Sequence, residues 1–160
     1  TSEFSLTDLR RKASELFAFG GSPGLQLSVT SFGFRNGLPR DADLVFDVRF
    51  LANPHYDPLL RPLTGQDPAV GAHVAADPLF TPFFDRMLDL IRLLLPAYAR
   101  EGKSYLTVAV GCTGGKHRSV FVTERLAEEL RQDGWRVTVR HRDMPDADLA
   151  RTGSPAAKPV

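Results

Sequence analysis

The sequence has a single cysteine, Cys112, so no intrachain disulfide can form. This is compatible with a reducing cytosol. No apolar run approaches the roughly 18 residues that a membrane-spanning helix requires, and we expect no membrane partner. The net charge is only +1, which excludes a strong general attraction to nucleic acid or membranes. Any basic patch must therefore be local.

What is present is the composition of a globular domain, with 42% hydrophobic and 24% charged residues among 160. This length is sufficient for one domain with a substantial core. A helical pattern over 5–18 followed by a glycine-rich break predicts a linker helix and flexible break at 1–24. The main domain is predicted at 25–143. Residues 144–160, rich in Pro, Ala, Asp and Gly, predict a disordered tail.

The apolar patterns of the main domain predict an α/β fold. The run at 104–110 is almost continuously apolar, as in a central strand covered on both faces. We therefore predict a mainly parallel sheet with helices on both faces, in which residues 104–132 form a strand, an anion loop and a helix. The predicted strands are 25–34, 44–50, 104–110 and 135–141, and the predicted helices are 68–75, 79–100 and 118–132. The predicted apolar stripe of the second helix is Phe83, Met87, Leu90, Ile91 and Leu94.

The most informative segment is the glycine-rich turn Gly111–Ser119. It contains three consecutive basic side chains, Lys116, His117 and Arg118, whereas a purely structural turn needs only its glycines. The backbone N–H groups of such a turn, together with the start of the next helix, bind phosphate groups. The turn is not a Walker A loop, because that motif requires Ser or Thr after the lysine and His117 stands there.

Cys112 and Arg118 flank five residues, which is the Cys-x5-Arg-Ser pattern of cysteine-dependent protein phosphatases. In such a site the cysteine is a thiolate nucleophile and the arginine holds the phosphate. Gly111 stands where those enzymes usually have a histidine, and a single cysteine at the end of a buried strand is more often a small core residue than a nucleophile. Catalysis by Cys112, Arg118 and Asp47 is therefore an alternative to binding without turnover. The candidates for the general acid are Asp41, Asp47 and Asp57.

Half of the twelve prolines lie within residues 51–82, and this density prevents a long helix. The aromatic and aliphatic residues of this segment nevertheless predict an ordered loop. Its His55 could bond to a ligand, but no second His or Cys stands at metal-ligand spacing, so we predict no metal site. Asp47 and Arg49 form either an ion pair or a ligand contact. We assign no ligand role to His141.

Several ungapped motifs together resemble the C-terminal domain of the RNase adapter protein RapZ family, over residues 1–143. They are Ser31–Phe34, Asp41–Phe50, Asn53–His55, Leu60–Gly65 and Gly111–Ser119. The resemblance implies a cytoplasmic regulatory domain that binds glucosamine-6-phosphate and small RNAs, presents the RNAs to an endoribonuclease, and self-associates. ATP and GTP are expected only in the N-terminal kinase-like half of such proteins, and no cofactor is expected in this domain.

The resemblance also implies which residues contact the ligand, and it favours a binding domain over an enzyme. The implied contacts are Asp47, His55, Thr113, Gly114, Lys116, His117 and Arg118, and the loop itself adds Gly115 and Ser119. The enterobacterial member ends in a Lys/Arg-rich tail linked to RNA binding, whereas residues 144–151 here are acidic to neutral. This predicts weak RNA binding. The weak candidates for RNA contact are Arg136, Arg140 and Arg142, which a charged surface strand explains as well.

Overall fold

The structure, a computed structural model, describes residues 24–145. The predicted linker helix and all but the first two residues of the predicted tail lie outside the described residues. The elements in chain order are β1 (Gln26–Gly33), the 3₁₀ turn η1 (Phe34–Asn36), β2 (Leu44–Asp47), the 3₁₀ turn η2 (Pro54–Tyr56), α2 (Pro68–Ala75), α3 (Phe80–Arg100), β3 (Tyr105–Cys112), α4 (Arg118–Gln132) and β4 (Val137–His141).

The four strands form one sheet in the order β2-β3-β1-β4, and every neighbouring pair is parallel. This confirms the α/β class and the parallel sheet. The register places Gly33 opposite Cys112 and Asp47 opposite Gly111. The three strands β1, β2 and β3 therefore end at the same edge of the sheet, and the segments that follow them meet there.

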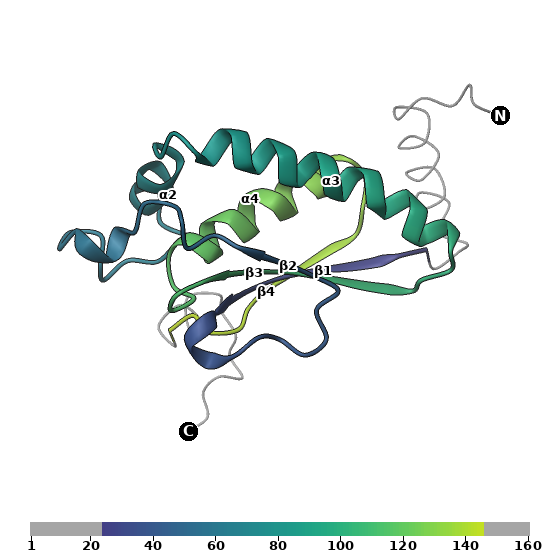
Figure 1. Cartoon of the computed structure of the whole chain (residues 1–160), viewed down its shortest axis with the longest axis horizontal. Coiled ribbons are helices and arrows are strands. Elements are labelled where there is room, and N and C mark those ends of the chain that lie inside the picture. Colours follow the sequence, from purple (N-terminus) through teal and green to yellow (C-terminus); the bar gives the residue numbers. More distant parts are fainter. Residues whose placement is uncertain (1–23, 146–160) are drawn as a thin grey trace.

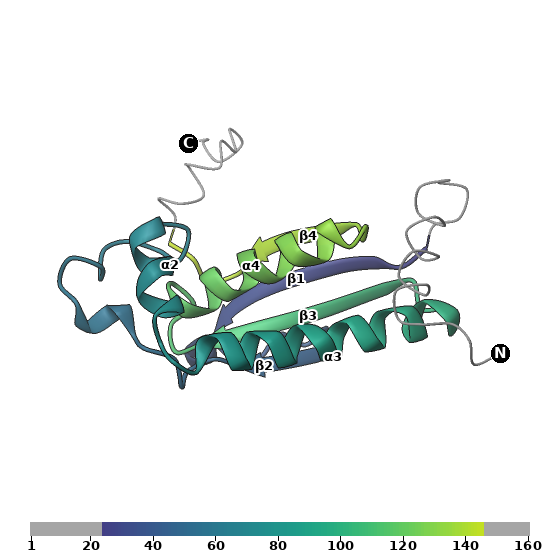
Figure 2. The same cartoon turned by 90° about the horizontal axis from the view of Figure 1, so that it is seen from above.

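Helices α2, α3 and α4 lie on one side of the sheet (Figures 1 and 2), whereas helices were expected on both sides. The strand order explains this difference. The crossovers from β2 to β3 and from β3 to β4 run in the same direction across the sheet, so right-handed connections put their helices on the same face. The connection from β1 to β2 runs in the opposite direction. It passes along the other face (Figure 1) and contains only η1 and an irregular segment.

The core lies between the sheet and these helices. In the predicted strand 25–34, the alternating residues Leu25, Leu27 and Val29 are at most 3% exposed. The stripe predicted for α3 is only partly right, because Leu90 is 42% exposed. The buried face instead follows i, i+4 and i+7 spacing. It comprises Phe80, Phe84, Met87, Leu88, Ile91 and Leu95.

Although α3 has 21 residues, neither it nor another helix of the described part is apolar enough to cross a bilayer. Met144, where the tail was predicted to begin, is only 6% exposed.

Candidate anion-binding site

The carboxyl ends of β1 and β3 form a topological switch point. These neighbouring strands send the chain to opposite faces of the sheet, since β1 leads to η1 and β3 leads to α4. In open parallel sheets, ligands bind outside the strand ends at such a point. Cys112 ends β3 at this position, and the glycine-rich turn follows it directly. The topology thus indicates a ligand site at the same loop that the sequence singled out.

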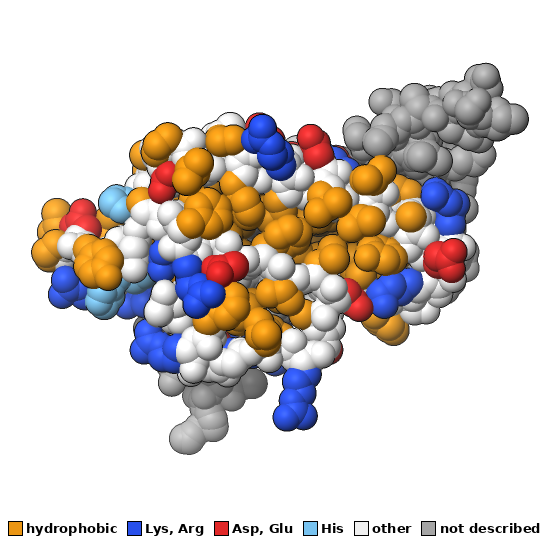
Figure 3. All heavy atoms as spheres, viewed as in Figure 1, with side chains coloured by type: hydrophobic (Ala, Val, Ile, Leu, Met, Phe, Trp, Pro, Cys, Tyr) orange, Lys and Arg blue, Asp and Glu red, His pale blue; other side chains and the backbone are white. Residues whose placement is uncertain are grey.

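A cavity of about 700 Å³ opens beside the loop. In Figure 3, basic and histidine side chains gather at the end of the molecule where β1 and β3 end. The lining includes four cationic side chains and one carboxylate, so the charge of the cavity favours anions. The cationic residues are Arg35, Arg61, Lys116 and Arg118, and the carboxylate is Asp143.

The structure brings most of the predicted ligand residues together. His55, Thr113, Gly114, Lys116, His117 and Arg118 line the cavity. Gly115 and Ser119 are buried in the same loop but do not line it. Asp47 does not line it either, although it lies at the same edge of the sheet.

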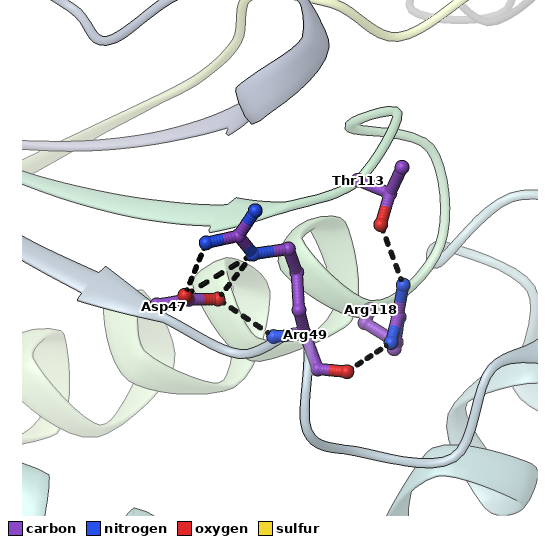
Figure 4. A network of polar contacts seen from close by, with 4 residues as sticks. All are labelled: Asp47, Arg49, Thr113 and Arg118. Atoms are coloured by element: carbon purple, nitrogen blue, oxygen red, sulfur yellow. Dashed lines mark hydrogen bonds and ion pairs between the residues drawn. The ribbon is translucent and has the colours of Figure 1, made fainter.

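Asp47 is held by Arg49 instead (Figure 4). The Arg49 guanidinium donates to both carboxylate oxygens, with an Nη2–Oδ2 distance of 2.7 Å and an Nε–Oδ1 distance of 2.9 Å. These side-chain hydrogen bonds are the main cause that lowers the pKa of Asp47. Of the two possibilities left open by the sequence, the ion pair is therefore present. A ligand contact by Asp47 stays a prediction.

The backbone of the loop is free to receive an anion. Among the described residues, the amide N–H groups of Thr113, Gly114, Lys116 and His117 donate to no other backbone group. Gly115 has a φ of 80°, a conformation that favours glycine. A Cβ at Gly115 would also lie 2.7 Å from the amide nitrogen of Gly33. The glycines thus let the loop pack against β1 while these four amides donate to no backbone group.

Arg118, the first residue of α4, is only 4% exposed and holds two segments together (Figure 4). Its Nη1 donates to the carbonyl oxygens of Arg49 and Leu51 at 2.6 and 3.0 Å, and its Nη2 lies 3.4 Å from the Thr113 hydroxyl oxygen. Within the described residues its Nε is buried without a hydrogen-bond partner. Leaving a buried charged donor unpaired costs free energy, so Nε is a donor suited to a bound anion.

Lys116 and His117 fix the proline-rich segment to the loop. Lys116 Nζ and His117 Nε2 both donate to the Arg61 carbonyl oxygen, at 2.8 and 3.1 Å. The Gly65 N–H donates to the Lys116 carbonyl oxygen at 2.9 Å. Burial, the largest cause, lowers the pKa of His117, so this ring is neutral at about pH 7 and Lys116 supplies the positive charge.

Cys112 lines the cavity and is 3% exposed. Its Sγ lies 3.1 Å from the Ser119 hydroxyl oxygen. Burial by itself raises the pKa of the thiol, but hydrogen bonds from Ser119 and from the Gly115 amide, with the charge of Arg118, lower it overall. The loop therefore stabilises negative charge at its base. None of the three aspartates proposed as the general acid lines the cavity.

Sequence reasoning did not assign several of the lining residues to the site, among them Arg35, Asn36 and Asp143. These three come from the segments that follow β1 and β4, whose approach to the loop depends on the pairing of the strands. Asp143 accepts a 2.8 Å hydrogen bond from the Gly33 amide and pairs with Arg142. Arg142 also donates to the Gly37 carbonyl oxygen. It is thus already engaged, whereas the other two weak candidates for RNA contact, Arg136 and Arg140, are exposed.

A second depression, of about 670 Å³, lies between α2 and α4, away from the anion loop. Its lining mixes carboxylates with arginines, including Glu124, Arg125, Glu128 and Arg131. We place the candidate site at the anion loop and not here, because mixed charge does not select an anion.

Comparison with known proteins identifies the family to which this domain is similar. A model of the RapZ C-terminal domain matches residues 25–145. A nucleotide-binding protein of Rhodospirillum rubrum is 62% identical over 138 residues, which are 86% of this chain and 43% of that protein. Nucleotide-binding proteins of Rhodospirillum centenum and Ruegeria pomeroyi are 57% and 51% identical, over 43% and 53% of their lengths. The chain thus spans about half the length of these relatives.

Proposed function

Because the chain belongs to the family of the RapZ C-terminal domain, we propose that it is the sensing module of a cytoplasmic RNase adapter. Its ligand is a phosphorylated amino sugar of the glucosamine-6-phosphate class, bound with its phosphate on residues 113–118. The ligand is bound and not consumed. Small RNA, an endoribonuclease and further copies of the chain are the partners that this role requires. Nucleotide binding belongs to the part of its relatives that this chain does not cover.

The observation that carries the proposal is the buried Nε of Arg118, which lacks a partner beside loop amides that donate to no backbone group. A phosphate monoester offers three acceptor oxygens and a charge of about −1.5 to −2 near pH 7. Its oxygens would satisfy several of these donors at once, through charge-assisted hydrogen bonds. A neutral sugar would leave the Arg118 charge without a counter-ion.

The rest of the cavity suits a sugar. A volume of about 700 Å³ lies in the range of small-molecule sites. The Tyr56 side chain, 79% exposed, offers a ring face for a sugar to stack on. Asn53 accepts from the His55 amide through Oδ1, which leaves its side-chain NH₂ group for a sugar hydroxyl.

Thermal unfolding with and without glucosamine-6-phosphate tests the proposal. The ligand should raise the midpoint of the wild-type chain in a concentration-dependent way, and Arg118→Ala should abolish this rise. Because Arg118 also supports the fold, Lys116→Gln serves as a second variant and should bind at least about tenfold more weakly. A folded wild-type chain whose midpoint does not move at millimolar ligand would overturn the proposal.

A second candidate function is favoured by the thiol of Cys112, whose pKa is lowered within the anion loop. In a phosphatase, this thiolate would attack phosphorus and break the P–O bond to the leaving alcohol, which takes a proton from a general acid. Water would then hydrolyse the S–P bond and release inorganic phosphate. Phosphate release from an aryl phosphate that Cys112→Ser abolishes would support it. If neither protein turns over the ester while both bind glucosamine-6-phosphate, Cys112 is structural.

A further inference from the structure

Turn η1 brings Arg35 to the anion loop from the opposite side of the switch point. The Arg35 amide N–H donates to the Thr113 carbonyl oxygen at 3.2 Å. The guanidinium lies against Gly114, since a Cβ at Gly114 would be 2.7 Å from Arg35 Nη2 and 3.6 Å from Cζ. Any side chain at Gly114 would displace this guanidinium. Gly114 therefore makes room for a cation beside the loop.

The Arg35 guanidinium is uncommitted, although it lines the cavity. Among residues 24–145 its side chain has no hydrogen bond or ion pair. Other arginines around the loop each donate to a fixed partner: Arg49 to Asp47, Arg61 to His55, Arg118 to Leu51 and Arg142 to Asp143. Arg35 thus has all of its side-chain donors free, next to loop amides that are also free.

We propose that Arg35 is a further ligand-binding residue, which pairs with the second negative charge of a phosphate monoester and makes the site selective for dianions. The loop amides and Arg118 Nε recognise tetrahedral oxygens, which phosphate and sulfate esters share. The two esters differ in charge. A sulfate ester carries one negative charge, whereas a phosphate monoester carries close to two above its second pKa of about 6. This inference rests on the proposed function.

Calorimetric titration with a matched pair of ligands tests it. Wild type and Arg35→Gln are titrated with glucosamine-6-phosphate and with glucosamine-6-sulfate, at a pH well above 6, where the phosphate is mostly dianionic. Arg35→Gln should weaken phosphate binding by about tenfold or more and sulfate binding by less than about threefold. Arg35→Lys should retain part of the preference. Arg40→Gln, at an exposed arginine outside the cavity lining, is the control and should change neither.

The outcomes separate this inference from the proposed function. Equal weakening of both ligands by Arg35→Gln would mean that Arg35 only supports the loop, and would overturn the inference. Phosphate binding that Arg35→Gln leaves unchanged would also overturn the inference, while the proposed function would stand. A wild-type chain that binds neither ligand would overturn both.

Discussion

At the scale of single residues, a Cβ added at either of two glycines near the site would meet different kinds of atoms. A Cβ at Gly65 would lie 2.2 Å from the His117 carbonyl oxygen and 2.5 Å from the Phe121 amide nitrogen, which are backbone atoms that cannot move aside. We expect Gly65→Ala to lower the free energy of unfolding by more than about 3 kcal/mol. Gly114→Ala meets only the end of an exposed arginine, so it should cost less than about 1 kcal/mol.

Urea denaturation of both variants checks this contrast, and similar losses of stability in the two would contradict it. The effect on ligand affinity should be the reverse. Where both variants are folded enough for affinity to be measured, Gly114→Ala should weaken binding more than Gly65→Ala. Gly114→Ala stays folded and weakens phosphate binding, because the new methyl group pushes the Arg35 guanidinium off the loop.

Arg118 has both a structural and a binding role, and substitution separates them. Arg118→Met keeps an unbranched apolar stem but removes the donors to the carbonyl oxygens of Arg49 and Leu51. Leaving these acceptors unpaired should lower the free energy of unfolding by roughly 2–4 kcal/mol. Arg118→Lys keeps the charge but cannot satisfy both carbonyls and Thr113 together, so it should fall between wild type and Arg118→Met. A thermal midpoint of Arg118→Met equal to that of wild type would contradict this account.

The site could be predicted in part at this scale. Residues 113–118 could be identified from the sequence because they are contiguous and combine glycines with three consecutive basic side chains. Asp143 was not, since it reaches the site only through the pairing of Ser31 with His141 in neighbouring strands. Asp47 is a different case, because its carboxylate pairs with Arg49 two residues along the chain, and a ligand contact by Asp47 stays a prediction.

At the scale of elements, a partly buried chain of polar contacts links β1, β4 and α4. His141 Nδ1 lies 2.7 Å from the Ser31 hydroxyl oxygen, and its Nε2 donates to Glu124 Oε2 at 2.7 Å. The hydrogen bond to His141 is the first cause that lowers the pKa of Glu124 from 4.5. The folded state thus binds fewer protons than the unfolded state just below this value. The contribution of the pair is present above about pH 4.5 and is lost as the pH falls through the folded pKa.

Glu124→Gln should therefore lower stability at neutral pH, and its difference from wild type should shrink as the pH falls below about 4.5. Chemical denaturation at several pH values measures this difference. Glu128→Gln, at an exposed glutamate one turn along α4, is the control and should follow wild type throughout. A constant difference between Glu124→Gln and wild type across the pH range would contradict the pairing.

The helices were the most predictable elements. The predicted ranges 68–75 and 118–132 agree with α2 and α4, because a proline starts the first and a glycine follows the second. The second strand was predicted to reach residue 50, but β2 ends at Asp47 because the Asp47 side chain accepts from the Arg49 amide and turns the chain. The placement of α2, α3 and α4 on the same face was not predictable, since it follows from the order of the strands.

At the scale of the whole molecule, charge limits any interaction with RNA. The net charge is +1, and of the three weakly predicted arginines only Arg136 and Arg140 are exposed. RNA binding by this chain should therefore be weak. The logarithm of its binding constant should fall with the logarithm of salt concentration with a slope no steeper than about −2, as for two or three phosphate contacts. Fluorescence anisotropy over a salt series measures this slope. A steep slope that persists in the double variant Arg136→Gln/Arg140→Gln would reveal another RNA-binding surface.

At the proposed site, the turn between β3 and α4 holds the phosphate of a sugar. Two-dimensional ¹H–¹⁵N NMR of the labelled chain provides the sharpest test. The chain is titrated with glucosamine-6-phosphate and, as a control, with glucosamine, which lacks the phosphate group. We expect the phosphate ester to shift the amide signals of residues 113–119 most strongly, and glucosamine to leave them in place. Shifts confined to another surface, such as the depression between α2 and α4, or no shifts at millimolar ligand, would contradict this placement of the phosphate.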